Sequence, residues 1–186
     1  MTPAGGEPLP SFPGWVYQQQ KTRGLTRAAG HIEKGFIMAT LNDMGYKKVF
    51  VSLDGTEQQD KVLERAIVVA ANNNAELIIG HVIDSTILET SGSYPTDLIP
   101  GLDKAFRDSI AGLVAKAKEN PDIPKVEVQV KTGRIRETLK EEMLDVVKPD
   151  LVLCGARGLS SIKYALLGSI STFLLRNTAC DILVVK

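Results

Sequence analysis

The sequence predicts an α/β fold: a five-stranded parallel sheet in the order 3-2-1-4-5, with helices on both faces. Two observations predict it. Short apolar segments alternate with segments of helical periodicity along residues 46–186, a pattern typical of parallel sheets. The second and fourth short segments are apolar throughout, as in central strands, whereas the third alternates with polar residues, as at an edge. Right-handed crossovers between neighbouring strands then favour the stated order.

The first half of this region contains two expected strands and two expected helices. Residues 49–53 are β-branched and aromatic, and residues 77–82 are nearly all apolar, so both segments are expected to be strands. Residues 57–74 carry apolar side chains at helical spacing and end in three asparagines, and helical spacing returns over 106–117. A loop rich in Ser, Thr, Gly and Pro is expected over 84–101.

The second half of residues 46–186 contains three expected strands and two expected helices. Residues 126–131 alternate between valine and polar side chains, which predicts a half-exposed strand. Apolar side chains at helical spacing predict a third helix over 135–148, ended by a proline. Residues 151–154 are an apolar strand, a last helix is expected near 169–177, and residues 182–185 are the last strand.

Residues 1–43 differ in composition from the rest of the chain. Four of the nine prolines fall within residues 1–14, and no periodicity at two or 3.6 residues follows. Such a segment buries too little apolar surface to offset the entropy of ordering it. We expect a disordered or dispensable leader, or an extension ahead of a start at Met38 or Met44. A targeting or partner-docking peptide around the apolar residues 15–17 is the alternative.

Bulk composition limits the classes of function. Lys plus Arg and Asp plus Glu both number 22, so no net charge favours nucleic acid or a membrane surface as a partner. No apolar stretch approaches the roughly 18 residues that a membrane span needs, and no secretory signal is visible. Cys154 and Cys180 lack metal-site spacing and are expected to be small buried thiols. We therefore expect a cytoplasmic protein.

A ligand site is expected where the strand order reverses, between the first and fourth strands. Ligands of such sheets bind at the carboxyl ends of the strands that flank this point. Ser52 and Asp54 lie at the end of the first strand, Gly155–Gly158 follow the fourth, and Gly168–Ser171 open the last helix. Topology therefore brings together segments that lie about a hundred residues apart in the sequence.

The residue types in these segments suit a nucleotide. Glycines allow the backbone to approach a ligand closely. The free N–H groups at the start of the last helix suit a phosphate, as do the hydroxyls of Ser169 and Ser171. Arg157 adds a positive charge for the same anion. Asp54 is an acceptor that repels phosphate, so a ribose hydroxyl or an adenine-side donor suits it better.

Each of these residues also has a purely structural interpretation. Asp54 followed by Gly55 is a common turn pair, and a serine before a helix is usually an N-cap. His81 lies within an apolar strand and is interpreted as a core histidine with satisfied hydrogen bonds, because no Ser-His-Asp arrangement is visible around it. His31 falls in the leader and is given no role.

The spacing Gly155-x2-Gly158-x9-Gly168-Ser169, with a hydroxyl at Ser171, resembles the nucleotide-binding signature of the ATP-binding universal stress proteins. The stretch VFVSLDGTEQQDKVLERAIVVA resembles their first strand, Asp turn and first helix, and ELIIGHVID their second strand. The resemblance covers residues 46–186. It implies a Rossmann-like fold of the adenine nucleotide alpha hydrolase type.

The resemblance also implies roles for single residues. Ser52 and Asp54 would face the adenosine, and Val82 would recognise adenine through its backbone. Two further sets follow: Cys154, Gly155, Arg157 and Gly158 would flank the ribose and phosphates, and Gly168, Ser169 and Ile170 would hold the phosphate tail. The family more often has a small apolar residue or proline at the position of Ser52, and Cys154 also departs from its pattern.

The expected function is a nucleotide-responsive regulatory module of the stress response that binds ATP with Mg²⁺, with ADP or AMP as alternative ligands. A slow ATP-hydrolysing enzyme and a dimerisation module with an empty pocket are the alternatives, and no Walker or kinase motif is present. The apolar last strand, Ile182–Val185, is expected at a sheet edge, where it invites pairing with a second copy. The resemblance implies the same homodimer; a helix covering the edge within one chain is the alternative.

Overall fold

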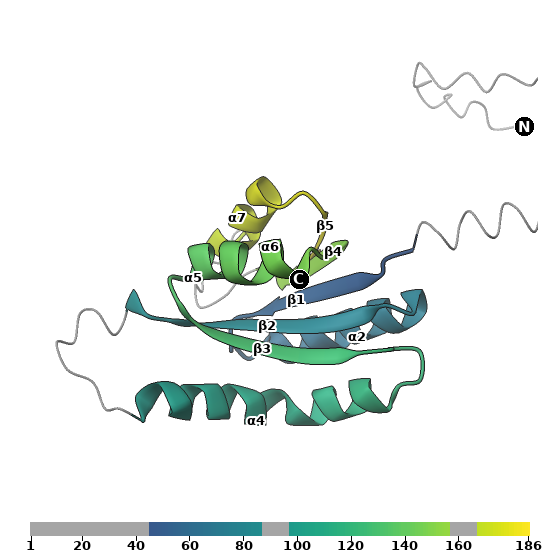
Figure 1. Ribbon diagram of the computed structural model, residues 1–186, viewed down its shortest axis with the longest axis horizontal. Coiled ribbons are helices and arrows are strands. Elements are labelled where there is room, and N and C mark those ends of the chain that lie inside the picture. The colour runs from purple at the N-terminus through teal and green to yellow at the C-terminus, as the bar shows by residue number, and fades with distance from the viewer. Residues whose placement is uncertain (1–44, 87–96, 157–166) are drawn as a thin grey trace, which may run out of the picture. The chain divides into compact units, whose positions relative to one another are not determined.

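The computed structural model describes residues 45–86, 97–156 and 167–186. Met44–Lys186 forms a compact unit (Figure 1). The expectations about residues 1–43 concern residues outside the described part of the chain. The same holds for two expected site residues, Arg157 and Gly158.

The sheet has five parallel strands in the order β3-β2-β1-β4-β5, which confirms the order that the sequence predicted. All five strands lie where the apolar segments placed them. Their bounds are β1 Lys48–Leu53, β2 Glu76–Asp84, β3 Val126–Gly133, β4 Leu151–Gly155 and β5 Asp181–Val185. The order reverses between β1 and β4, so the carboxyl ends of these two strands flank the switch point.

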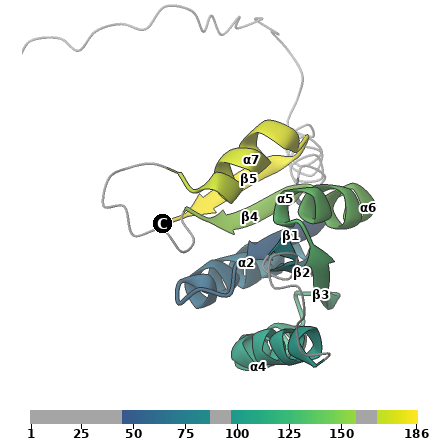
Figure 2. The same ribbon diagram turned by 90° about the vertical axis from the view of Figure 1, so that its left-hand side faces the viewer.

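Helices cover both faces of the sheet (Figure 2). The helices α2, Gln59–Asn73, and α4, Leu98–Glu119, lie on one face. The other face carries α7, Ser169–Asn177, and one continuous helical segment. That segment consists of α5 Ile135–Glu137, η1 Thr138–Leu144 and α6 Asp145–Val147.

Alternation along β1 divides the core into two layers. Val49 and Val51 pack in the layer under α2 and α4, whereas Phe50 packs in the layer under η1 and α7. All three side chains are fully buried. Because successive side chains of a strand point to opposite faces, a central strand with both faces covered must be apolar throughout.

Three local features differ from the sequence-based expectations. The segment expected as an ordinary helix over 135–148 has π-helical hydrogen bonding in η1, a wider turn that periodicity does not reveal. The helix α4 begins at Leu98, well before residue 106, and its first turn tolerates Pro100 because no N–H donor is needed there. Cys154 is buried as expected, but Cys180 is only half-buried.

Gly80, in the middle of β2, lies directly against the ring of Phe50. A Cβ atom at position 80 would lie 2.2 Å from Cζ of Phe50, and this ring is fully buried and cannot move aside. We therefore expect Gly80→Ala to lower the free energy of unfolding by about 1–3 kcal/mol through overpacking. Urea denaturation measures this change.

The matched control is Gly112→Ala in α4, where an added Cβ meets nothing within 4 Å. This substitution removes the entropic cost of a helical glycine, so it should raise the free energy of unfolding by about 0.4–1 kcal/mol. Equal effects of the two substitutions would contradict the close packing of Gly80 on Phe50.

Candidate functional site

A cavity of about 360 Å³ lies at the carboxyl ends of β1 and β4. Its walls come from the end of β1, the start of α2, β2, the start of the helical segment after β3, the end of β4 and the first turn of α7. Cavities that hold small ligands typically enclose about 300–1,000 Å³. The cavity therefore has the place and the size expected of a ligand site in a doubly wound sheet.

Every expected site residue within the described part of the chain lines this cavity. They are Ser52, Asp54, Val82, Cys154, Gly155, Gly168, Ser169, Ile170 and Ser171. The fold thus brings together the ends of two strands and the start of a helix that the sequence had placed at one point. The lining also includes residues that sequence reasoning had not selected: Leu53, Thr56, Gln58, Gln59, Val62, Ile135 and Leu139.

Hydrogen-bond donors lie at the start of α7. Gly168 is the N-cap, and its own N–H donates to the carbonyl of Ala156 at 2.7 Å. The first backbone bond of the helix joins Thr172 N–H to the Gly168 carbonyl at 3.0 Å. The helix therefore has no carbonyl for the N–H groups of Ser169, Ile170 and Ser171, and these groups and the helix dipole favour an anion.

Ser171 plays a different part from the one expected of its hydroxyl. The side chain is 2% exposed, and Oγ lies 3.0 Å from the carbonyl of Gly168 and 3.3 Å from that of Ala156. A hydroxyl has a single proton, and here it is donated to the backbone. Ser171 therefore ties the first turn of α7 to the end of β4, whereas Ser169 is exposed beside the cavity.

Asp54 is both a turn residue and an acceptor at the cavity wall, the two interpretations that the sequence allows. One carboxylate oxygen, Oδ1, accepts hydrogen bonds from the backbone N–H of Thr56 at 3.1 Å and from its hydroxyl at 2.7 Å. Gly55 has φ +76°, the left-handed conformation that favours glycine. The turn thereby holds an exposed carboxylate at the cavity wall, where it accepts hydrogen bonds and repels phosphate.

Burial keeps the cysteine of the cavity wall and the nearby histidine neutral. It raises the pKa of the Cys154 thiol to about 11, so this side chain stays protonated at neutral pH. Burial also lowers the pKa of His81, whose Nδ1 lies 2.9 Å from the carbonyl of Leu53. The His81 ring stacks on Phe106 with 4.0 Å between centroids. As expected, His81 is a partnered histidine, although it is only half-buried.

A second hollow, of about 330 Å³, adjoins the other side of the first turn of α7. It shares Ile135, Ser169 and Ile170 with the first cavity. The charged residues that line it are Asp84, Arg134, Arg136 and Glu137. Both signs of charge are therefore present on this side of α7.

A cleft of about 750 Å³ lies at the amino end of the sheet, away from the switch point. Among its lining residues, Asp150 accepts hydrogen bonds from the backbone N–H groups of Lys47 and Lys48, both at 2.8 Å. Tyr46 donates its hydroxyl proton to Asp181 at 3.0 Å, and this bond raises the pKa of the tyrosine. These two carboxylates hold the start of β1 in place.

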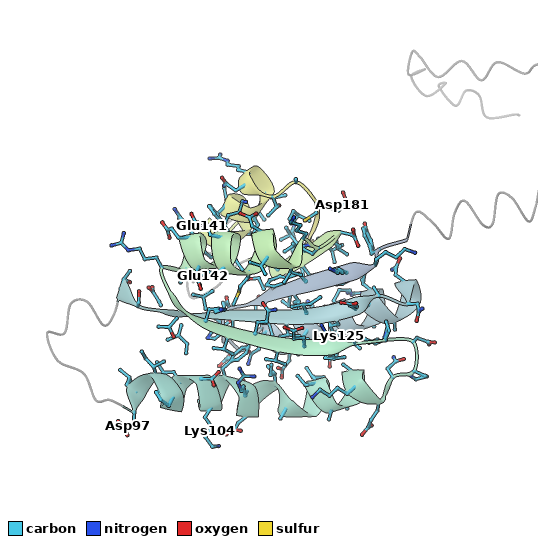
Figure 3. The ribbon with its side chains drawn as sticks, in the orientation of Figure 1. Asp97, Lys104, Lys125, Glu141, Glu142 and Asp181 are labelled. Carbon is cyan, nitrogen blue, oxygen red and sulfur yellow. The ribbon has the colours of Figure 1, made fainter. Side chains whose placement is uncertain are left out.

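Other charged side chains lie outside the three hollows. Asp97 and Lys104, for example, lie at the start of α4 and along it, on the side away from the sheet (Figure 3).

Comparison with known proteins identifies the family. The model of the universal stress protein family matches residues 45–186. The chain belongs to this family. A curated universal stress protein of Staphylococcus saprophyticus is 27% identical over 141 residues, which are 76% of this chain and 84% of the relative. The resemblance to the universal stress proteins is thus confirmed at the level of the family.

Solved structures of the family share the fold. UspA from Lactobacillus plantarum aligns with a TM-score of 0.60 at 18% identity, over 76% of this chain and 99% of that one. A universal stress protein solved in complex with cAMP aligns with a TM-score of 0.51 at 26% identity, over 76% of this chain and 97% of that one. The Rossmann-like α/β architecture is therefore that of the family. Within the described residues, no helix has the length and apolar character needed to cross a membrane.

Proposed function

We propose that this universal stress protein binds an adenine nucleotide, ATP in particular, in the cavity at the ends of β1 and β4. It would act as a nucleotide-responsive regulatory module of the stress response. The observation that carries the proposal is the position of the first turn of α7 on a cavity of about 360 Å³ at the switch point. Unpaired N–H groups at a helix N-terminus suit a phosphate.

The polarity of the cavity supports a nucleotide rather than a simple anion. The start of α7 supplies donors, whereas Asp54, at the end of β1, supplies an acceptor that repels phosphate. Apolar side chains of the same lining, Val62, Val82 and Leu139, suit a base. A family member of 26% identity was solved with cAMP, which has the same adenosine part.

The residues that line the cavity suit regulated binding of a nucleotide better than they suit catalysis. Asp54 is the one carboxylate among the described residues of the cavity wall, and Cys154 is held as a neutral thiol. Within the described residues, no three His, Cys, Asp or Glu side chains form a group that could hold a metal ion. Mg²⁺ would therefore be held mainly by the nucleotide phosphates and water, with the hydroxyl of Ser169 beside them.

Measurement of nucleotide bound to the full chain tests this proposal. We expect adenine nucleotide to co-purify and calorimetric titration with ATP and Mg²⁺ to give one site per chain. A hundredfold excess over Kd should stabilise the fold by about 2.7 kcal/mol, seen as a higher melting temperature. UTP serves as the control, because it keeps the triphosphate but changes the base. No heat with any adenine nucleotide and no co-purified nucleotide would exclude the proposed function.

A further inference from the structure

One buried polar atom of the cavity wall has no hydrogen-bond partner within residues 45–86, 97–156 and 167–186. Gln59, the first residue of α2, is 8% exposed and lines the cavity. Its Nε2 donates a hydrogen bond to the hydroxyl oxygen of Ser109, in α4, at 3.0 Å. Its carbonyl oxygen, Oε1, is buried and has no hydrogen-bond partner among the residues that the structure describes. Buried polar groups without partners are rare and call for a water, an ion or a ligand.

The orientation of this amide is set by its neighbour. The hydroxyl of Ser109 donates its single proton to the carbonyl of Phe106 at 2.7 Å, so toward Gln59 it can only accept. If the amide were turned the other way, Oε1 of Gln59 would face Oγ of Ser109, and two acceptors would lie against each other. Gln59 therefore presents Oε1, an acceptor, as its free group.

Gln59 lines the same cavity as the acceptor Asp54, and its oxygen is buried beside that cavity. Gln59 begins the helix that follows the Asp54 turn, whereas the N–H donors proposed for the phosphates come from a different wall, at the start of α7. A nucleotide with its phosphates at α7 directs its nucleoside part toward Asp54 and Gln59. The terminal torsion of glutamine is soft, so the amide can tilt toward a donor that enters the cavity.

We propose that Oε1 of Gln59 accepts a hydrogen bond from an N–H or O–H group of the nucleoside part of the bound nucleotide. Gln59 then makes the site selective for ligands that carry this donor, either a ribose hydroxyl or the 6-amino group of adenine. A ligand without the donor leaves the buried oxygen unpaired and binds more weakly. This inference rests on the proposed nucleotide function.

Titrations of the full chain with four ligands test the proposal: ATP, 2′-deoxy-ATP, 3′-deoxy-ATP and ITP, which has a carbonyl in place of the 6-amino group. We expect wild type to bind one of the three analogues at least about tenfold more weakly than ATP. The analogue that does so identifies the donor. In Gln59→Leu this difference should disappear, because the acceptor is gone.

A second variant and a control separate selectivity from folding. Ser109→Ala removes the hydroxyl that orients the amide of Gln59. It should therefore reduce the difference in affinity between ATP and the weaker analogue, although Oε1 of Gln59 is still present. Gln129→Leu replaces a half-buried glutamine of β3 that bonds Glu127 at 2.8 Å, far from the switch point, and should retain the wild-type preference. Melting curves without ligand show whether each variant is folded.

Two results would overturn the inference: equal binding of all four ligands by wild type, or an unchanged preference in Gln59→Leu. If Gln59→Leu loses affinity for all four ligands equally, the preference is unchanged and the inference is also overturned, because an equal loss indicates a general effect on packing. Failure of wild type to bind any nucleotide is a separate result, which removes the proposed function itself.

Discussion

Replacement of Gly168 by valine is expected to abolish nucleotide binding and to leave the fold intact. Gly168 is the N-cap of α7 and lines the cavity, so a branched side chain here stands between a phosphate and the first-turn N–H groups. Its backbone, with φ −63° and ψ 165°, is an extended conformation that valine readily adopts. The loss therefore arises from the blocked site and not from backbone strain.

Calorimetric titration with ATP and Mg²⁺ measures the effect, and melting curves without ligand check the fold. The matched control is Gly101→Val in α4, where an added Cβ meets nothing within 4 Å, and this variant should bind as wild type does. Asp54→Ala should weaken binding less than Gly168→Val. Undiminished affinity in Gly168→Val would rule out the start of α7 as the phosphate site.

A lysine at position 183 is expected to convert a homodimer into a monomer. We propose that Ile182–Val185 of β5 pair with the same strand of a second copy. Among the described strands, β5 pairs with β4 alone, and Leu183 at its centre is 38% exposed although it is apolar. Soluble proteins normally protect such an edge with charge, proline or a bulge. A two-fold axis near the centre of the strand brings both copies of residue 183 together, so two lysines repel each other.

Light scattering at micromolar concentration measures the assembly. Wild type should have a mass close to twice the 20.2 kDa of one chain, and Leu183→Lys should have the mass of one. The control, Leu102→Lys, changes an equally apolar side chain of α4 that is 43% exposed, and this variant should remain dimeric. A monomeric wild type would contradict the proposal.

The short-range pattern of apolar and polar residues was sufficient to predict the fold and most residues of the candidate site. Central strands need apolar side chains on both faces, so the contrast between residues 151–154 and 126–131 predicted the strand order. The start of α7 at Ser169 agrees with its helical pattern. Because topology determines which strand ends meet, the sequence predicts that Asp54, Gly155 and Gly168 lie at one site, and all three line the same cavity.

The hydrogen-bonding roles of Ser171 and Gln59 could not be predicted from the sequence pattern, because they depend on contacts between elements that are distant in the sequence. The hydroxyl of Ser171 looks from the sequence like a phosphate donor, but it bonds the carbonyl of Ala156 across the turn from β4. Gln59 looks like an ordinary polar residue at a helix start. Its burial and its free oxygen depend on Ser109, fifty positions along the chain in another helix. Periodicity reports which face of an element is buried, whereas the direction of a single hydrogen bond depends on the neighbour that tertiary packing supplies.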